Sequence, residues 1–600
     1  MSTVKTLPPR SEIAEADTWD LSSLFPNHAA WEEGFKQFEE KIGGFAAFRG
    51  QLSKDAATLA ACLDFDNEVD RLGERVYIYA SLHTTQDQAN STYQAMLGRV
   101  INVFTRASEA ASFIRPEVMA IPDATIQQFL AASELAPHKL TLERMLRYKP
   151  HTLGEKEEHL LAMQGEMAGA ANRAFRQLLD ADMKFGTVTN EKGEEVELGN
   201  STLSSFLLSP SRDVRKTAFH QYYKQFVGHE NTLAATLQGS IQKDAYYARA
   251  RHYDSSLTAA LFPDNVPQTV YDNLIAAVHN HLPALYRYYE LRRRKMGLDA
   301  IHHYDTYVPI ITDMQVNRTW DDAVELVINS LQPLGSEYCG VLNEGLRGRW
   351  CDRYPNQGKQ SGAFSCGSFD ADPYILMNYQ EDVFNDVFTL THEAGHSMHS
   401  YYSASHQPFQ YYNYTIFVAE VASTFNEELL AHYMLERAGS DTERAYLINR
   451  AIDDIRGTII RQTMFAEFEK LTHEMVEAGE PLTVQAFKDT YRKLLERYFG
   501  PEFTLDDELS LECLRIPHFY RAFYVYKYAT GMSAAVALSQ RVLQGGEQEL
   551  QDYLGFLKGG CSQDPLDLLR GAGVDMESPE SVNTALQHFE SLVGELEQLL

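Results

Sequence analysis

Apolar residues recur three or four positions apart along most of this chain, which is the spacing of one face of an α-helix. Residues 585–600 are a clear example. Segments that resemble strands are few. Residues 183–198 read as a hairpin with its turn at Asn190 to Gly193, and residues 373–379 form a short extended run. The pattern therefore predicts a mainly α-helical fold with a small β-sheet.

The size of the chain bears on its division into domains. It has 600 residues, of which 44% are hydrophobic. A single hydrophobic core seldom grows this large, so we expect two or more lobes. The hairpin offers a boundary. We predict an N-terminal helical region over residues 1–204 that ends in the hairpin, and a second region over residues 205–600 that holds the motifs described below.

Charge and cysteine content restrict the partners and the compartment. Acidic residues outnumber basic ones by 83 to 53, and the net charge is −30. Such a surface disfavours nucleic acid or an anionic membrane as the main partner. The chain has no CxxC pair, no apolar signal-peptide core at its start and no run of about 18 apolar residues. We therefore expect a cytoplasmic protein that does not bind or cross a membrane.

Residues 392–399 read HEAGHSMH and lie in a segment with a helical pattern, for which Asp382 is the expected N-cap. The apolar stripe of this predicted helix consists of Val383, Val387, Leu390, Ala394 and Met398. At about 100° per residue, the three histidines fall on roughly the opposite side. A buried core histidine is the usual explanation for a single histidine on a helix. It does not easily account for three on a face turned away from the core.

The spacing within this motif is that of a metal site. His392 and His396 are one helical turn apart, so both imidazoles can reach one ion. Glu393 follows the first histidine and can approach a water bound to that ion. This is the HExxH pattern of zinc hydrolases, in which zinc lowers the pKa of its water to about 7 and the glutamate takes the proton during attack on a carbonyl. We predict His392 and His396 as zinc ligands and Glu393 as the general base.

A catalytic zinc needs a third protein ligand. His399 is the less favoured alternative, because it lies about 10.5 Å along the helix from His392. It could instead line the cleft or support the site. In the next predicted helix, Glu420 stands between apolar residues, where a carboxylate without a partner is costly. We predict Glu420 as the third ligand and consider Glu427 a possible supporting residue.

These residues resemble a known family. HEAGHSMH, followed 24 residues after His396 by the Glu420 of FVAEVAS, is similar to oligoendopeptidase F, a bacterial branch of the zinc oligopeptidases related to thimet oligopeptidase. Residues 358–379, the segment IPHFYRAFYVYKYATG at residues 516–531 and the N-terminal WDLSSLF are also similar to that family. The resemblance therefore covers most of the chain.

The resemblance implies a two-lobed helical protein around a deep channel, with residues 205–600 as the zinc metallopeptidase catalytic region. One Zn2+ per chain would serve hydrolysis of internal bonds in short, unstructured peptides, by attack of a zinc-bound water that Glu393 activates. The strand over residues 373–379 would pair with the substrate backbone. Its substrate-binding residues would be Tyr374, Ile375, Leu376 and Met377.

In the same family, a histidine and tyrosines near the C-terminus stabilise the tetrahedral intermediate. The resemblance points to His518 and Tyr524 for this role, and to Tyr526 and Tyr528 as substrate-binding residues. The spacing of these residues departs from thimet oligopeptidase, where a glycine-rich turn carries one of the tyrosines, so the identity of the donor stays open.

Two other functions remain under consideration. A dipeptidyl carboxypeptidase of the same superfamily would have a similar site but release C-terminal dipeptides. A helical peptide-binding protein would hold a structural zinc or none. A structural site is expected to have four protein ligands and no base beside them, and Glu393 argues against it. The sequence leaves the side-chain preference, the length limit of the substrate and the oligomeric state open.

Overall fold

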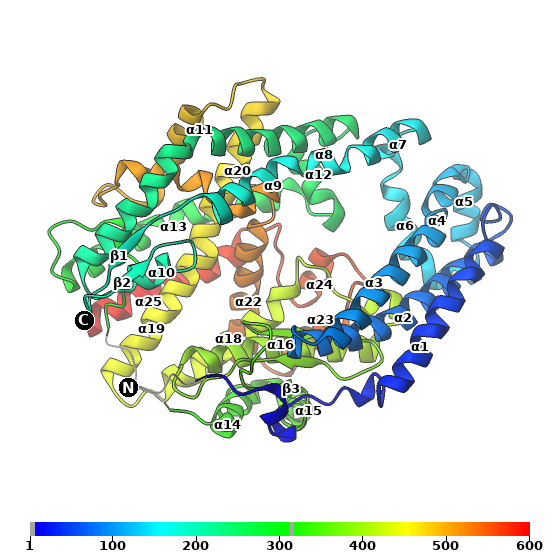
Figure 1. The fold of residues 1–600 in the computed structure, drawn as a ribbon, viewed down its shortest axis with the longest axis horizontal. Coiled ribbons are helices and arrows are strands. Elements are labelled where there is room, and N and C mark those ends of the chain that lie inside the picture. The colour runs from blue at the N-terminus through cyan, green and yellow to red at the C-terminus, as the bar shows by residue number, and fades with distance from the viewer. Residues whose placement is uncertain (1–5, 312–316) are drawn as a thin grey trace. The chain divides into compact units, whose positions relative to one another are not determined.

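The computed structural model describes residues 6–311 and 317–600. The chain forms two compact units, each built from three segments (Figure 1). The first unit comprises Met1–Pro150, Gln315–Leu430 and Leu538–Gly573, and the second comprises His151–Met314, Ala431–Ala537 and Val574–Leu600. The mainly helical fold is confirmed. The division at residue 204 stays a prediction about the chain's domains.

The first unit is helical apart from a three-stranded sheet. Its helices are α1 (His28–Lys41), α2 (Ala56–Gln86), α3 (Ser91–Ala111), α4 (Ile114–Ala120), α5 (Asp123–Leu130), α6 (Lys139–Arg147), α14 (Trp320–Ser330), α15 (Gly335–Arg347), α16 (Asn385–His406), α17 (Phe409–Tyr412), α18 (Ala419–Glu436, which ends in the second unit), α23 (Glu547–Lys558) and α24 (Pro565–Gly571). Polar caps set where the long helices begin. The Asp55 carboxylate accepts the Thr58 N–H at the start of α2, and the Asn90 side chain caps α3. Helices α1, α2 and α3 pack side by side around buried residues such as Trp31 and Val76 (Figure 1).

The sheet of the first unit has the order β3-β5-β4, with β3 at Cys351–Asp352, β4 at Phe364–Cys366 and β5 at Tyr374–Leu376. β3 runs parallel to β5, and β4 runs antiparallel to it with Ser365 opposite Ile375. β5 therefore confirms the strand expected over residues 373–379. It is the central strand, which the sequence did not predict.

The second unit holds most of the remaining helices and a hairpin. Its elements are α7 (Glu155–Met163), α8 (Gly165–Ala168), α9 (Ala170–Gln177), β1 (Thr187–Thr189), β2 (Glu195–Glu197), α10 (Leu203–Leu207), α11 (Arg212–Ala250), α12 (Ser256–Leu261), α13 (Gln268–Lys295), α19 (Asp441–Ile455), α20 (Arg461–Glu477), α21 (Val484–Phe499), α22 (Tyr526–Gln544, which ends in the first unit) and α25 (Glu580–Leu599). β1 and β2 pair antiparallel, and the Gly193 N–H donates to the Asn190 carbonyl in the turn between them. Gly193 has a φ of 82°, which a glycine adopts at no steric cost. The predicted hairpin is confirmed.

Helix length and polarity bear on membrane insertion. α11 spans 39 residues, which is more than enough to cross a bilayer, but it begins with charged residues such as Arg212 and Asp213 and carries further charges along its length. Within the two described ranges, no helix is both long and apolar enough to cross a membrane.

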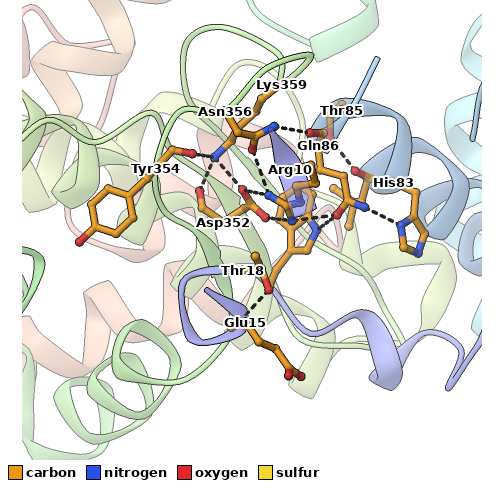
Figure 2. Close-up of polar contacts among 12 residues, drawn as sticks. Arg10, Glu15, Thr18, His83, Thr85, Gln86, Asp352, Tyr354, Asn356 and Lys359 are labelled. Atoms are coloured by element: carbon orange, nitrogen blue, oxygen red, sulfur yellow. Dashed lines mark hydrogen bonds and ion pairs between the residues drawn. The ribbon is translucent and has the colours of Figure 1, made fainter. Parts of the chain in front are cut away.

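A polar network connects the N-terminal segment with later segments of the first unit (Figure 2). The Arg10 guanidinium donates to Asp352 Oδ1 at 2.8 Å and to Gln86 Oε1 at 3.1 Å. Asp352 also pairs with Lys359, at 2.7 Å, and both side chains are fully buried. Lys359 donates further to the carbonyl of Tyr354 at 2.7 Å, so the buried charges keep the hydrogen bonds that their burial requires. The network fixes the end of β3 and the start of the loop that leads to β4.

Candidate metal centre

Helix α16 carries the histidine motif and buries its opposite face. Val387, Leu390, Ala394 and Met398 are all at most 1% exposed, as the apolar stripe predicts. Val383 is 36% exposed, because it precedes the first turn of the helix. The expected cap is wrong. α16 begins at Asn385 after Phe384, without a side-chain cap, so Asp382 lies too early to cap it.

Gly395 lets helix α18 approach helix α16 closely. A Cβ atom added at Gly395 would lie 2.5 Å from the carbonyl oxygen of Ala422 and 2.6 Å from the Cα of Ser423. Both are backbone atoms of α18, and carbon contacts ordinarily begin near about 3.5 Å. The absence of a side chain at this position therefore sets the distance between the two helices at the level of Glu420.

The three predicted ligands converge across this contact. Glu420 Oε2 lies 3.3 Å from His392 Nε2 and 3.4 Å from His396 Nε2. In the part of the chain that the structure describes, these three residues form the one group of histidine, cysteine or acidic side chains whose donor atoms all lie within 4.8 Å of one another. Two imidazoles and a carboxylate are the donor set of a catalytic zinc. The residues therefore fit a zinc ion.

The charges of the site favour a cation at this point. Burial alone would lower the pKa of His392, but its contacts with Glu420 and Glu427 raise that pKa to about 10. Burial would raise the pKa of Glu420, but the two histidines hold it well below its usual range. Both pKa shifts reflect attraction between the carboxylates and positive charge at the position of the imidazoles.

Glu393 lies beside the ligands and is 7% exposed. Burial raises the pKa of its carboxyl, His392 and His396 oppose that rise, and Glu420 adds to it. The backbone N–H of Ser365 in β4 donates to the same carboxylate. A buried carboxylate with a raised pKa is a better proton acceptor near neutral pH than an exposed one. The position and environment of Glu393 suit a general base.

His399, the alternative ligand, does not belong to the cluster. Its side chain is 1% exposed, and its ring stacks on Tyr414 with 3.7 Å between ring centroids. Burial lowers the pKa of His399 to about 3, so the ring is neutral. The Tyr414 hydroxyl lies 3.2 Å from Ser400 Oγ. Tyr414 was not among the predicted site residues. It belongs to residues 406–415, an aromatic-rich segment that the sequence suggests is either channel wall or a packed connection, and here it packs against the far end of the motif.

Glu427 lies beside the first predicted ligand. Its Oε2 lies 3.5 Å from His392 Nδ1, on the side of the imidazole away from Glu420. A carboxylate in this position fixes the tautomer of a metal-binding histidine, and its loss typically weakens metal binding by about 10- to 100-fold.

We therefore expect Glu427→Ala to weaken zinc binding by about 10- to 100-fold, as measured by competition with a chromogenic chelator. Glu325→Ala is the control. Glu325 is an exposed acidic residue on α14 of the same unit, so its removal changes the net charge equally and should leave the affinity unchanged. Equal affinities for the two variants would show that Glu427 does not support the site.

The expected substrate contacts of β5 need correction. Tyr374, Ile375, Leu376 and Met377 are at most 1% exposed, and β5 is paired on both sides by β3 and β4. A strand with two neighbours has no free backbone groups to offer a peptide. Sequence reasoning recognised the strand but could not identify its neighbours, which are only two and three residues long.

The predicted C-terminal site residues belong to the second unit. His518, Tyr524 and Tyr528 form one aromatic group, with ring centroids 6.4 Å apart for His518 and Tyr524 and 5.3 Å apart for the two tyrosines. Tyr526 does not join them. It is fully buried and packs against Tyr271 at 5.2 Å, so the expectation that it binds substrate does not agree with its position.

The sequence matches known peptidases over nearly its whole length. Residues 205–588 match peptidase family M3, and residues 117–185 match a domain described as oligopeptidase F. The oligopeptidase PepF of Bacillus subtilis is 44% identical over 99% of this chain and 89% of its own length. An oligoendopeptidase F homologue of Borreliella burgdorferi is 37% identical over 98% of this chain and 99% of its own.

Solved structures agree with the sequence matches. A structure from Chlamydophila abortus has a TM-score of 0.94 at 36% identity, covering 99% of this chain and 100% of that one. Oligoendopeptidase F from Enterococcus faecium has a TM-score of 0.74 at 34% identity, covering 95% of this chain and 98% of that one. The chain therefore belongs to peptidase family M3, in its oligoendopeptidase F branch, and is a metalloendopeptidase.

Proposed function

We propose that this chain is a zinc-dependent endopeptidase that cleaves internal bonds of short, unstructured peptides. The observation that carries the proposal is the convergence of His392, His396 and Glu420, with Glu393 buried beside them. The three side chains would hold the ion. They are 17–39% exposed, which leaves room for a water and a peptide carbonyl to reach it.

Zinc, when bound, polarises the peptide carbonyl and makes water more acidic. Glu393 accepts the proton of the attacking water and delivers it to the leaving amine, because its buried carboxylate has a raised pKa and lies next to His392. The Ser365 N–H donates to one side of this carboxylate and so helps to orient it. Burial within the site also keeps bulk water away from Glu393.

We propose β4, in place of β5, as the strand that pairs with the peptide. β4 is an edge strand of the sheet, because β5 is its only strand neighbour among the described residues. It lies against α16, where the hydroxyls of Ser365 and Ser397 are 2.8 Å apart. Pairing through backbone groups holds a peptide with little regard to its side chains. That would suit an enzyme that acts on varied oligopeptides.

His518 and Tyr524 would donate hydrogen bonds to the anionic tetrahedral intermediate, and Tyr528 would contact the peptide. The supporting observation is that the three rings form one group in the second unit, with Tyr524 half-buried and His518 exposed. Burial and the neighbouring Arg521 lower the pKa of His518, so its imidazole is largely neutral at pH 7. A neutral imidazole or phenol can still supply the donor that this role needs.

Chelation tests the proposal. An internally quenched peptide of about ten residues with both ends blocked is cleaved by the untreated protein, and the products are identified by mass spectrometry. We expect cleavage at internal bonds, loss of activity after dialysis against a chelator, and recovery when about one equivalent of zinc per chain is added.

Two results would contradict the proposal in different ways. Release of C-terminal dipeptides, and only from peptides with a free C-terminus, would indicate a dipeptidyl carboxypeptidase. A zinc-loaded protein that binds the peptide without cleaving it would indicate a peptide-binding protein.

A further inference from the structure

Phe523 has a backbone conformation that an aromatic residue rarely adopts. Its φ is 57°, in the left-handed region, where a bulky residue persists only if its surroundings hold it. The side chain is 2% exposed, and its ring lies 4.5 Å from that of His473 and 6.0 Å from that of Tyr271. Phe523 lies in the connection that leads into α22, immediately before Tyr524. The conformation of Phe523 therefore affects a proposed catalytic residue.

A buried carboxyl group contacts the backbone of Phe523. Glu469, on helix α20, accepts the Phe523 N–H on its Oε1 atom at 3.0 Å. Glu469 is 2% exposed, and its Oε2 atom has no hydrogen-bond partner among the residues that the structure describes. Burying a carboxyl with so few partners is costly. Among the described residues, the Phe523 N–H is the hydrogen-bond donor to this carboxyl.

The residues around Glu469 make other contacts and do not accept the Phe523 N–H. His473, one turn further along α20, donates from Nδ1 to the backbone carbonyl of Glu469 at 2.7 Å, and its Nε2 lies 3.6 Å from Asp244 Oδ2. Burial raises the pKa of the Glu469 carboxyl well above its usual range, the Phe523 N–H opposes that rise, and Asp244 adds to it. Glu469, His473 and Phe523 therefore form one closely packed cluster.

The side chains around the left-handed turn lie on two sides of the chain. Phe523 and Tyr526 point into the interior, at 2% and 0% exposed. Tyr524 lies on the other side, where the Arg521 guanidinium is 4.0 Å from its ring centroid and the Tyr528 ring is 5.3 Å away. If Phe523 took an ordinary φ, the chain direction at Tyr524 would change, and with it the direction of the phenol.

We propose that Glu469 is a positioning residue for Tyr524. Its buried carboxyl holds the left-handed turn at Phe523 and thereby the direction of the Tyr524 hydroxyl. The inference rests on the proposed role of Tyr524 in stabilising the intermediate. Glu469 itself acts through the backbone, at one residue's remove from the phenol.

The test is a double-mutant cycle in kcat and KM on the blocked peptide. Tyr524→Phe should lower kcat by about 100-fold. Glu469→Met, which removes the acceptor, should lower kcat by about 10- to 100-fold with KM and zinc content unchanged. Added to Tyr524→Phe, it should cause no further loss, because the hydroxyl that it positions is already absent. Glu469→Gln should keep kcat within about threefold, because its amide oxygen can accept the same N–H.

Glu467→Met is the matched control. Glu467 is a second buried carboxylate on α20, bonded to His279 at 2.7 Å and to Tyr498 at 2.8 Å. Its replacement should lower the melting temperature without changing kcat. If Glu469→Met does not fold, Glu469→Asp takes its place, because the shorter side chain withdraws the carboxyl from Phe523.

The possible outcomes separate this inference from the proposed function. If Tyr524→Phe is impaired and Glu469→Met has wild-type kcat, the positioning role is overturned and the role of Tyr524 stands. If the two losses multiply in the double variant, Glu469 acts on something other than the hydroxyl, and the inference also fails. If Tyr524→Phe has wild-type kcat, the proposed role of Tyr524 fails and the inference fails with it.

Discussion

Glu393→Gln is expected to keep one zinc per chain and to lose about 10²- to 10⁴-fold in kcat. Glutamine has nearly the same shape as glutamate and can still accept the Ser365 N–H, but it cannot take a proton from water. His392 and His396 on either side of it are unchanged, so metal binding should persist. The measurement is kcat on the internally quenched peptide, with zinc determined on the same samples by atomic absorption.

The zinc assay decides how a loss of activity is understood. A variant that is inactive and metal-free would say nothing about proton transfer, whereas an inactive variant with a full zinc complement identifies Glu393 as the base. Glu337→Gln on α15 is a suitable control, because it makes the same chemical change at another helix of the first unit. Wild-type kcat in Glu393→Gln would disprove the proposed mechanism.

Gly395→Ala is expected to weaken zinc binding by about 100-fold or more. The new Cβ would lie 2.5 Å from the Ala422 carbonyl oxygen and 2.6 Å from the Ser423 Cα, so α16 and α18 must separate by about 1 Å to make room. Glu420 is on α18, and metal sites tolerate deviations of only about 0.2 Å in ligand distance. The change adds a single methyl group and replaces none of the predicted ligands. Zinc affinity is measured by competition with a chelator.

Gly340→Ala is the matched control for this prediction. Gly340 is also in a helix of the first unit, α15, and a Cβ added there would have no heavy atom within 4 Å. Alanine favours helix over glycine by about 1 kcal/mol, so this variant should be as stable as wild type or more stable, with normal zinc affinity. If Gly395→Ala binds zinc as tightly as Gly340→Ala, the close helix contact does not position Glu420.

Most of the candidate metal site could be predicted from the sequence, because it depends on spacing within short segments. The one-turn spacing of His392 and His396 is set by helix geometry alone, and the hairpin is set by its turn residues. Glu420 needed a further argument, from a charge between apolar neighbours, and the structure places it beside both histidines. The zinc identity, the cytoplasmic location and the substrate class remain predictions.

The features that sequence reasoning missed depend on contacts between distant segments. The position of β5 within the sheet depends on β3 and β4, which are too short to show a strand pattern. Tyr526 is buried against Tyr271, and Phe523 nearby has a left-handed conformation that no pattern of residue types predicts for phenylalanine. Glu427 reaches His392 only because α16 and α18 pack together. Each case requires knowledge of which elements are neighbours.

Anomalous diffraction at the zinc absorption edge, from crystals of the zinc-loaded protein, would show directly whether these residues bind the ion. We expect one strong peak per chain, at about 2.0–2.2 Å from His392 Nε2, His396 Nε2 and a carboxylate oxygen of Glu420. Glu393 should lie near the zinc without coordinating it. Zinc coordinated by His399 or by residues elsewhere in the chain, or no peak near His392 and His396, would disprove the proposed site.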